Sequence, residues 1–382
     1  MSRSPEKMRA WAAINLSALE RNLKAIRMAL PSHLRFISVV KANAYGHGLA
    51  PVVTRLMRSQ ADAFAVANLE EAARLREVGT GWPVLVLSVL LPEEHEEAIE
   101  LGIHPVVSTV EEIRSLALLA KRMGQVVGVH LKVDTGMGRL GIWYPEFPQL
   151  FGELHAHDSV RLAGICTHYS SADSDPAFTS LQRNRFLSCL KHVPDEVCRQ
   201  ILVHADNSAG IESFPEGGGF NAARIGLLQF GIRPKPGSLL SQTLTEPVLS
   251  FHARVGLVKD LPSGSPVSYG QTHKLARPSR VAVLTAGYAD GLPTSLSNAG
   301  MVIIQERLCP IIGRVTMDQT MVDVTDLPSR PVTGDTATFI GSSGGQSITA
   351  TDFAGWSGRI EWEVLCSLSD RTQRIYRTDT AV

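Results

Sequence analysis

The sequence has no surplus charge, no long hydrophobic run and few cysteines. Its 37 basic residues balance 37 acidic ones, so no net field attracts nucleic acid or an anionic membrane. The five cysteines are odd in number and contain no C-x-x-C pair, which argues against a zinc site or a disulfide framework. No segment reaches the roughly 18 apolar residues of a membrane span, and the polar N-terminus lacks a signal-peptide core. We therefore expect a cytoplasmic protein without metal, membrane or nucleic-acid partners.

The composition is that of a folded protein. With 44% hydrophobic and 19% charged residues, the chain lies far from the composition of disordered proteins. Its 382 residues are enough for two domains, or for one large barrel with an appendage.

Short apolar runs alternate with helical stretches through the first part of the chain. Eight runs are predicted to be buried parallel strands: 36–40, 64–67, 84–87, 105–107, 127–133, 162–167, 201–204 and 224–228. Capping-box spacing predicts helix starts at Ser17, Asn68 and Thr109, with the first helix ending before Pro31. Eight such units predict an α/β fold, a (β/α)8 TIM-type barrel, with a doubly wound open sheet as the alternative.

The sequence pattern changes in the proline-bearing stretch 232–247, after which helical periodicity fades. Downstream, β-branched runs are separated by glycine turns, with strands predicted at 254–258, 280–284, 301–304 and 320–324. We therefore predict a barrel domain over residues 1–240 and a mostly β C-terminal domain over 241–382. Residues before about position 15 are an exception that could pack with the β domain.

Two lysines stand at predicted strand ends, where barrel active sites lie. Lys41 follows the first strand, and a lysine removed from water can form a Schiff base with an aldehyde; the alternative is a solvated side chain. Lys132 shares one face of the fifth strand with Asp134. An ion-paired barrel rim would explain that pair equally well.

Further polar residues follow strands six, seven and eight. His168 comes after the sixth strand, Asn207 and Ser208 after the seventh, and Arg224 and Gly226 lie in the eighth. Barrels commonly bind phosphate at the last two of these ends, although Asn207 and Ser208 could simply cap a helix and His168 could be a core residue. A lysine, a histidine, an arginine and a phosphate site at one barrel mouth fit pyridoxal 5'-phosphate.

Five motifs occur in an order that resembles the alanine racemases from Lys41 to Tyr376. They are VKANAYGHG around Lys41, LKVDTGMGRLG around Lys132, VSYG around Tyr269, GYADG around Tyr288 and GRVTMDQ around Met317. The resemblance implies a pyridoxal-phosphate enzyme of fold type III that interconverts L- and D-alanine and supplies D-alanine for peptidoglycan.

The resemblance also implies roles for individual residues. Lys41 would hold the cofactor, Arg224 would face its ring nitrogen and His168 would lie beside the ring. The remaining residues expected at the cofactor, mostly near its phosphate, are Tyr45, Asn207, Ser208, Gly226 and Trp362.

Racemisation needs two acid–base groups on opposite faces of the reacting carbon. By resemblance these are Lys41, acting on the D-enantiomer, and Tyr269, acting on the L-enantiomer from the partner subunit of a head-to-tail homodimer with shared active sites. Substrate would contact Arg139, Met317 and Tyr288, with Asp318 behind them. Lys132 resembles the carbamylated lysine of the family, whose added negative charge orients Arg139.

Three residues depart from the family pattern and bear on substrate range. Trp362 and Phe230 stand where tyrosines are expected, and Thr316 replaces a cysteine. Alanine is the expected substrate, with serine or another small amino acid as the alternative.

Two other protein classes remain as less favoured alternatives. A fold-type III decarboxylase would be expected to carry an acid in place of Arg224. A barrel that only carries the cofactor would lack the second domain and Tyr269.

Overall fold

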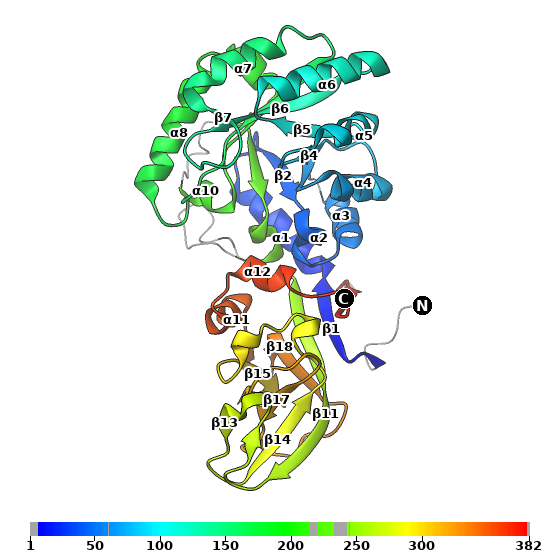
Figure 1. Cartoon of the computed structure of the whole chain (residues 1–382), viewed down its shortest axis with the longest axis vertical. Helices are drawn as coiled ribbons and strands as arrows, with labels where there is room; N and C mark the ends of the chain where they lie inside the picture. Colours follow the sequence, from blue (N-terminus) through cyan, green and yellow to red (C-terminus); the bar gives the residue numbers. More distant parts are fainter. Residues whose placement is uncertain (1–6, 60, 214–219, 233–242, 244, 380–382) are drawn as a thin grey trace. The chain divides into compact units, whose positions relative to one another are not determined.

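The computed structural model describes residues 7–59, 61–213, 220–232, 243 and 245–379 (Figure 1). The chain packs as two units. One comprises Glu20–Ala44 and Leu49–Glu246; the other comprises Met1–Leu19, Tyr45–Gly48 and Pro247–Val382. The domain boundary predicted between residues 240 and 241 lies outside the described residues.

The first unit is a nearly closed barrel of eight parallel strands. Their spatial order is β10-β2-β3-β4-β5-β6-β8-β9, and the amide of Arg224 on β10 donates to the carbonyl of Asp206 after β9 at 2.9 Å. The predicted barrel is confirmed, and the open sheet is excluded. The strands are β2 Arg35–Val39, β3 Ala63–Val66, β4 Val84–Val86, β5 His104–Val107, β6 Val127–Asp134, β8 Val160–Cys166, β9 Leu202–His204 and β10 Ala222–Ile225.

The eighth predicted strand was too long. It ends at Ile225, and Leu227–Phe230 forms a 3-10 helix, η4. Gly226 has φ −110° and ψ −93°, a conformation outside the extended region, so the strand cannot continue through it.

Helices lie outside the barrel strands (Figure 1). Side chains of Asn68 and Thr109 accept the amides of Glu71 and Glu112 at two of the predicted helix starts. The capping box predicted at Ser17 is wrong, because Asn15 accepts the amides of Ser17 and Ala18 instead. The helices are α1 Leu16–Ala29, α3 Leu49–Arg58, α4 Leu69–Val78, α5 His95–Glu100, α6 Val110–Met123, α7 Phe147–Leu154, α8 Pro176–Leu190, α9 Asp195–Gln200 and α10 Ser208–Ser213, and the short segment α2 Lys41–Tyr45 follows β2.

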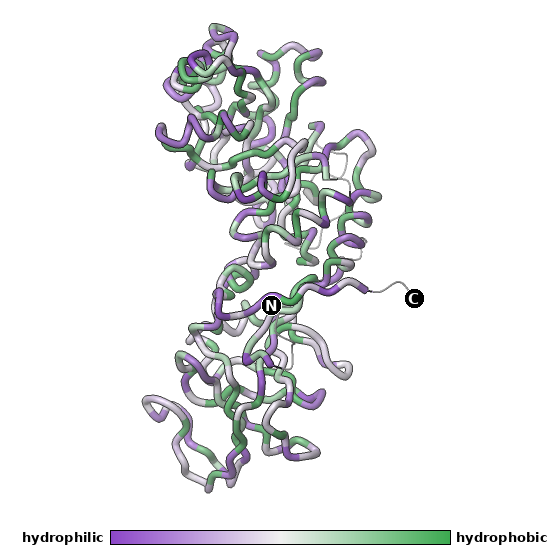
Figure 2. The backbone as a smooth tube through the Cα atoms, turned by 90° about the vertical axis from the view of Figure 1, so that its right-hand side faces the viewer, coloured by the Kyte–Doolittle hydropathy of each residue, from purple (hydrophilic) through white to green (hydrophobic). Residues whose placement is uncertain are grey.

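The strands and helices of the barrel enclose an apolar core. Val129, Leu131 and Ile165 on β6 and β8 are fully buried and pack with Phe147 of α7 and Phe186 of α8. Parallel strands are covered on both faces, which is why their sequences read as continuous apolar runs. Hydrophobic and hydrophilic stretches alternate along the backbone (Figure 2).

The second unit is mostly β. Its main sheet runs β16-β15-β18-β11-β1-β20, with β14 joining β11 to β17 and β19 pairing with β18. The four predicted strands are confirmed as β11, β14, β15 and β17. The strands of this sheet are β1 Ala10–Asn15, β11 Leu249–Leu261, β14 Ser279–Leu284, β15 Met301–Ile304, β16 Arg307–Pro310, β17 Thr320–Asp323, β18 Thr336–Ser343, β19 Gln346–Ile348 and β20 Gln373–Arg377. Strands β12 Pro266–Val267 and β13 His273–Lys274 form a separate pair.

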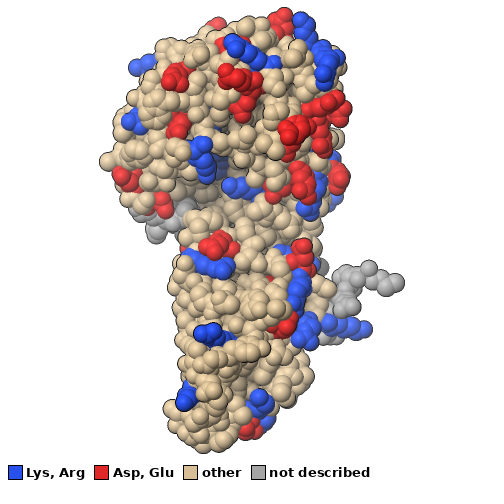
Figure 3. Space-filling view, in the orientation of Figure 1, with Lys and Arg blue, Asp and Glu red and all other residues tan. Residues whose placement is uncertain are grey.

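Two short helices, α11 Ala350–Ser357 and α12 Glu361–Cys366, complete this unit. Within the part of the chain that the structure describes, no helix combines the length and apolarity needed to cross a bilayer. Acidic and basic side chains are mixed on the visible face of the barrel unit (Figure 3).

Candidate functional site

Lys41 begins a left-handed turn at the end of β2. Ala42, Asn43 and Ala44 have φ between 52° and 55° and ψ between 47° and 52°, and Tyr45 has φ 50°. Such backbone is strained for L-residues other than glycine. The turn is held from outside, since the amide of Ala42 donates to a Glu71 carboxylate oxygen at 2.6 Å.

Arg224 is the most extensively bonded side chain of the barrel mouth. It is 5% exposed, and its two terminal nitrogens approach Nδ1 of His168 at 2.9 Å and Nδ1 of His204 at 2.7 Å. The same nitrogens donate to the carbonyls of Thr167, His204 and Ala205. Five bonds to groups at the carboxyl ends of two strands, β8 and β9, fix the plane of the guanidinium.

Positive charge gathers around His168. Burial lowers the pKa of His168 well below its usual value, and the nearby charges of Arg224, Lys132, Arg139 and Lys41 lower it further. The structure thereby brings together five of the predicted site residues. Their field keeps His168 neutral, so the lone pair of Nδ1 can accept from Arg224.

Histidines continue the network into the barrel. Nε2 of His204 lies 3.0 Å from Nδ1 of His130, and burial lowers the pKa of both rings well below the usual value. The sequence offered a signal for His130, since strand alternation places it on the same face as Lys132. Its partner His204 follows from no local pattern.

The ends of β9 and β10 meet at Ser208 and Gly226. The amide of Gly226 points to the hydroxyl of Ser208 at 3.4 Å. Asn207 accepts the amide of Gly210 at 2.7 Å and so caps α10; its role at the cofactor stays a prediction. Ser208 and Gly226 remain the predicted phosphate-binding groups.

At the end of β6, Lys132 is partly buried. Burial, followed by the charges of Arg224 and Arg139, lowers the pKa of Lys132 to about 8, against the raising effects of Cys166 and Asp134. The Asp134 carboxylate accepts the amides of Gly136, Met137 and Gly138. Asp134 therefore shapes the loop that leads to Arg139.

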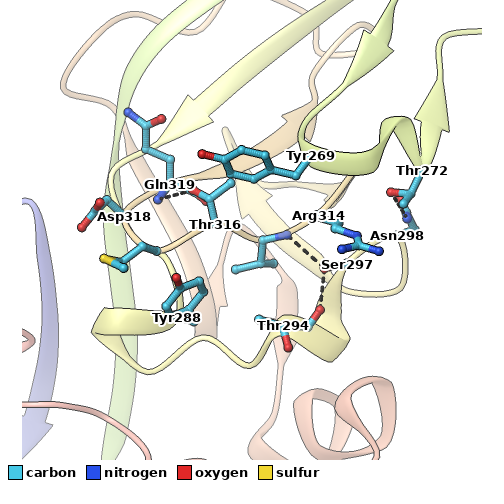
Figure 4. Close-up of a pocket in the computed structure, with 12 residues that line it drawn as sticks. Tyr269, Thr272, Tyr288, Thr294, Ser297, Asn298, Arg314, Thr316, Asp318 and Gln319 are labelled. Atoms are coloured by element: carbon cyan, nitrogen blue, oxygen red, sulfur yellow. Dashed lines mark hydrogen bonds between the residues drawn. The ribbon is translucent and has the colours of Figure 1, made fainter.

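The second unit carries a pocket of about 880 Å³ with Tyr269, Tyr288 and Met317 in its lining (Figure 4). Tyr269 stands in a 3-10 turn, η5 (Tyr269–Gln271), between Ser268 at φ 63° and Gln271 at φ 50°. The Ser268 hydroxyl donates to the carbonyl of Arg314 at 2.7 Å. In Figure 4, Tyr269 lies above Thr316, with Tyr288 below them.

The loops of Tyr288 and Met317 are held together directly. The amide of Tyr288 donates to the carbonyl of Thr316 at 2.9 Å, and that of Ala289 to Met317 at 3.0 Å. Arg371, which the sequence did not single out, donates to Asp318 at 2.8 Å and lies 3.3 Å from buried Asp290. These contacts link the loops that carry two predicted substrate residues.

Tyr45 and Trp362 belong to this second unit as well. Trp362 lies on α12 and is 37% exposed. Gly46, next to Tyr45, packs against the carbonyl of Leu365 at the end of the same helix so closely that a Cβ could not fit.

These observations define a barrel enzyme with an appended β domain. Its ionisable residues collect at the carboxyl ends of the barrel strands, and its phenols line a pocket in the β domain.

Comparison with known proteins identifies the family. The family models "Alanine racemase, N-terminal domain" and "Alanine racemase, C-terminal domain" match residues 14–234 and 248–376. A curated alanine racemase of Symbiobacterium thermophilum is 40% identical over 374 residues, covering 97% of this chain and 98% of that one.

Solved structures agree. The alanine racemase of Bacillus anthracis with bound L-Ala-P has TM-score 0.89 and 32% identity, covering 98% of this chain and 97% of that one. The alanine racemase of Bartonella henselae with covalently bound pyridoxal phosphate has TM-score 0.87 and 28% identity, covering 97% and 99%. The chain belongs to the alanine racemase family.

Proposed function

We propose that this chain interconverts L- and D-alanine with pyridoxal 5'-phosphate, using Lys41 and Tyr269 as acid–base groups on opposite faces of the substrate. Similarity to alanine racemases over nearly the whole chain supports the reaction. The immobilised Arg224 is the structural observation that carries the mechanism.

The residues at the barrel mouth fit this cofactor. An amine at Lys41 suits an aldehyde, and the Ser208 hydroxyl and the Gly226 amide meet at two strand ends, where both can donate to a phosphate. The Bartonella henselae relative holds pyridoxal phosphate covalently. When bound, the cofactor supplies an electron sink that eases removal of the α-proton.

Arg224 limits the electron-withdrawing strength of the bound cofactor. Its guanidinium stays protonated in proteins, and its two terminal nitrogens direct their four hydrogens at five acceptors. Arg224 can donate a hydrogen bond to a ring nitrogen but cannot hand over its proton. This restraint favours proton return over transamination, and it disfavours the decarboxylase alternative.

The substrate site combines Arg139 with Met317 and Tyr288. With a pKa of about 8, Lys132 carries a fraction of neutral amine near neutral pH. Its nitrogen can attack CO2, forming a C–N bond and losing one proton, and the resulting carbamate would be an anion beside Arg139. That anion would hold Arg139 toward the substrate carboxylate.

A second copy of the chain is proposed to complete the site. Tyr269 is 72% exposed, Met317 51% and Tyr288 45%, around one pocket. Large apolar side chains clustered in this way commonly mark an interface. A partner's barrel would cover the pocket and place its own Lys41 opposite Tyr269, giving a homodimer with shared active sites. The bulk of Trp362 would keep the substrate small, and the D-alanine formed would serve peptidoglycan synthesis.

The test is proton exchange at Cα. The purified protein, supplied with pyridoxal phosphate, is incubated in D2O with L-alanine or D-alanine and followed by proton NMR and chiral chromatography. Both enantiomers should lose the Cα proton signal and converge on an equal mixture. L-Serine should react more slowly, and L-lysine should release no CO2. Alanine that keeps both its proton and its configuration would refute the proposed function.

A further inference from the structure

Gln182 on α8 lies between two loops at the barrel mouth. It is fully buried, and its amide uses all four of its bonding positions. Oε1 accepts the amide and the hydroxyl of Ser170 at 3.0 and 3.2 Å. Nε2 donates to the carbonyl of His168 at 3.1 Å and to the hydroxyl of Thr135 at 3.3 Å.

The bonds beyond Thr135 run in one direction only. The Thr167 hydroxyl donates its single hydrogen to the carbonyl of Val133 at 2.9 Å. The 2.8 Å contact between the hydroxyls of Thr135 and Thr167 must therefore use the hydrogen of Thr135. Thr135 is left as an acceptor, so the side-chain nitrogen of Gln182 has to face it. The amide orientation is thereby fixed.

This series of hydrogen bonds ends at Arg224. The carbonyl of Thr167 accepts from Arg224 at 3.0 Å, and His168, whose carbonyl Gln182 holds, contacts Arg224 through its ring at 2.9 Å. Gln182 thus bonds to the backbone of one Arg224 partner and, through Thr135, to the side chain of another. Thr135 and Thr167 are both fully buried, so water does not compete for these groups.

Arg185, one helical turn after Gln182, holds the same loop. Its Nη1 donates to the carbonyl of Thr135 at 2.9 Å, and its guanidinium lies 5.5 and 5.0 Å from the ring centres of Trp143 and Tyr144. Residues three apart on a helix share one face. That face of α8 therefore fixes both the loop that leads to Arg139 and the loop of His168.

We infer that Gln182, through the directed chain Gln182–Thr135–Thr167, is a positioning residue that sets Arg224 and His168 for racemisation. The inference rests on the proposed function. Gln182 acts without touching substrate or cofactor, because its amide determines where the guanidinium of Arg224 and the imidazole of His168 stand.

The test compares two substitutions of nearly equal size. Gln182→Glu keeps an acceptor for Ser170 but, as a carboxylate, cannot donate to His168 or Thr135, and Gln182→Met removes both functions. Ser159→Ala is the matched control. It deletes the hydrogen bond from Ser159 Oγ to the Ala117 carbonyl at 2.8 Å, which lies at the amino end of β8, the end opposite to the barrel mouth. Wild type and variants are reconstituted with pyridoxal phosphate, and kcat and KM for both alanine enantiomers are divided by bound cofactor.

Both Gln182 variants should bind the cofactor, show an altered cofactor absorbance spectrum and lose about 10- to 100-fold in kcat/KM, mainly in kcat, as misplacement of reacting groups by about 1 Å can produce. Ser159→Ala should lose thermal stability with normal kcat. Thr135→Val should reproduce the Gln182 defect, and Thr135→Ser, which keeps the hydroxyl, should restore activity.

Wild-type protein inactive on alanine would refute the proposed function itself. Active wild type with Gln182 and Thr135→Val variants at full kcat per bound cofactor would overturn the positioning role, whatever their stability. If the Gln182 variants fail to fold, the comparison of Thr135→Val with Thr135→Ser tests the positioning role. Equal kcat in these two variants would overturn that role.

Discussion

The left-handed turn after Lys41 makes a stability prediction whose sign is unusual. Ala42 has φ 52° and ψ 52° and is exposed, so replacing it by glycine removes no packing. An L-residue in this conformation costs about 1–2 kcal/mol, which glycine avoids. Against this gain, glycine lowers the free energy of unfolding by about 0.4–1 kcal/mol, because it raises the conformational entropy of the unfolded chain. Ala42→Gly should therefore stabilise the protein by up to about 1.5 kcal/mol.

Urea unfolding at fixed protein and cofactor concentration measures the effect as a shift of the midpoint. Ala50→Gly is the matched control, since Ala50 is an exposed alanine in the first turn of α3, and there glycine should cost about 0.5–1 kcal/mol. Ala42→Val should destabilise, because a β-branched residue fits positive φ poorly. Equal losses for Ala42→Gly and Ala50→Gly would refute the idea that the turn stores strain.

Three further changes can be predicted. Tyr269→Phe should abolish turnover of L-alanine while leaving the cofactor bound, checked by chiral assay and absorbance; normal turnover would remove Tyr269 from the mechanism. Gly287→Ala should destabilise by about 1–3 kcal/mol through overpacking and raise KM, because the new Cβ would lie 2.5 Å from the Met317 carbonyl oxygen; an unchanged urea midpoint would contradict this. In CO2-free buffer Lys132 keeps its amine, whose pKa falls from 10.5 to about 8 on folding. The unfolded state then binds more protons between those two values, so stability relative to Lys132→Met should rise with pH there; a falling difference in the urea midpoint would oppose it.

Local patterns in the sequence predicted most of the barrel. The eight apolar runs mark strands because parallel strands buried on both faces must be apolar throughout. The starts at Asn68 and Thr109 were correct because a side chain three residues before an amide can cap it without help from elsewhere. Ser17 failed because Asn15 also reaches the first free amides, and spacing alone does not rank two competing caps.

Other features depend on contacts that sequence spacing does not encode. Ala42 to Tyr45 contain no glycine, and only Asn43 is of a type that often adopts the left-handed conformation, as a single residue; support for the turn comes from Glu71, far along the chain. The directed bonds of Gln182 join residues from three elements, so no local window contains them. Motif resemblance named Tyr269 and Lys41, but it could not show how their supporting loops are held.

Each active site is proposed to take Lys41 from one subunit and Tyr269 from the other. Lys41→Ala and Tyr269→Phe proteins, each inactive alone, are mixed, dissociated and reassembled. Half of the resulting dimers should contain one of each subunit, and each of these has one intact site, so about a quarter of wild-type racemase activity should return. Activity that stays at the level of the separate variants, with mixed dimers confirmed by mass spectrometry, would show that the two subunits do not share active sites in this way.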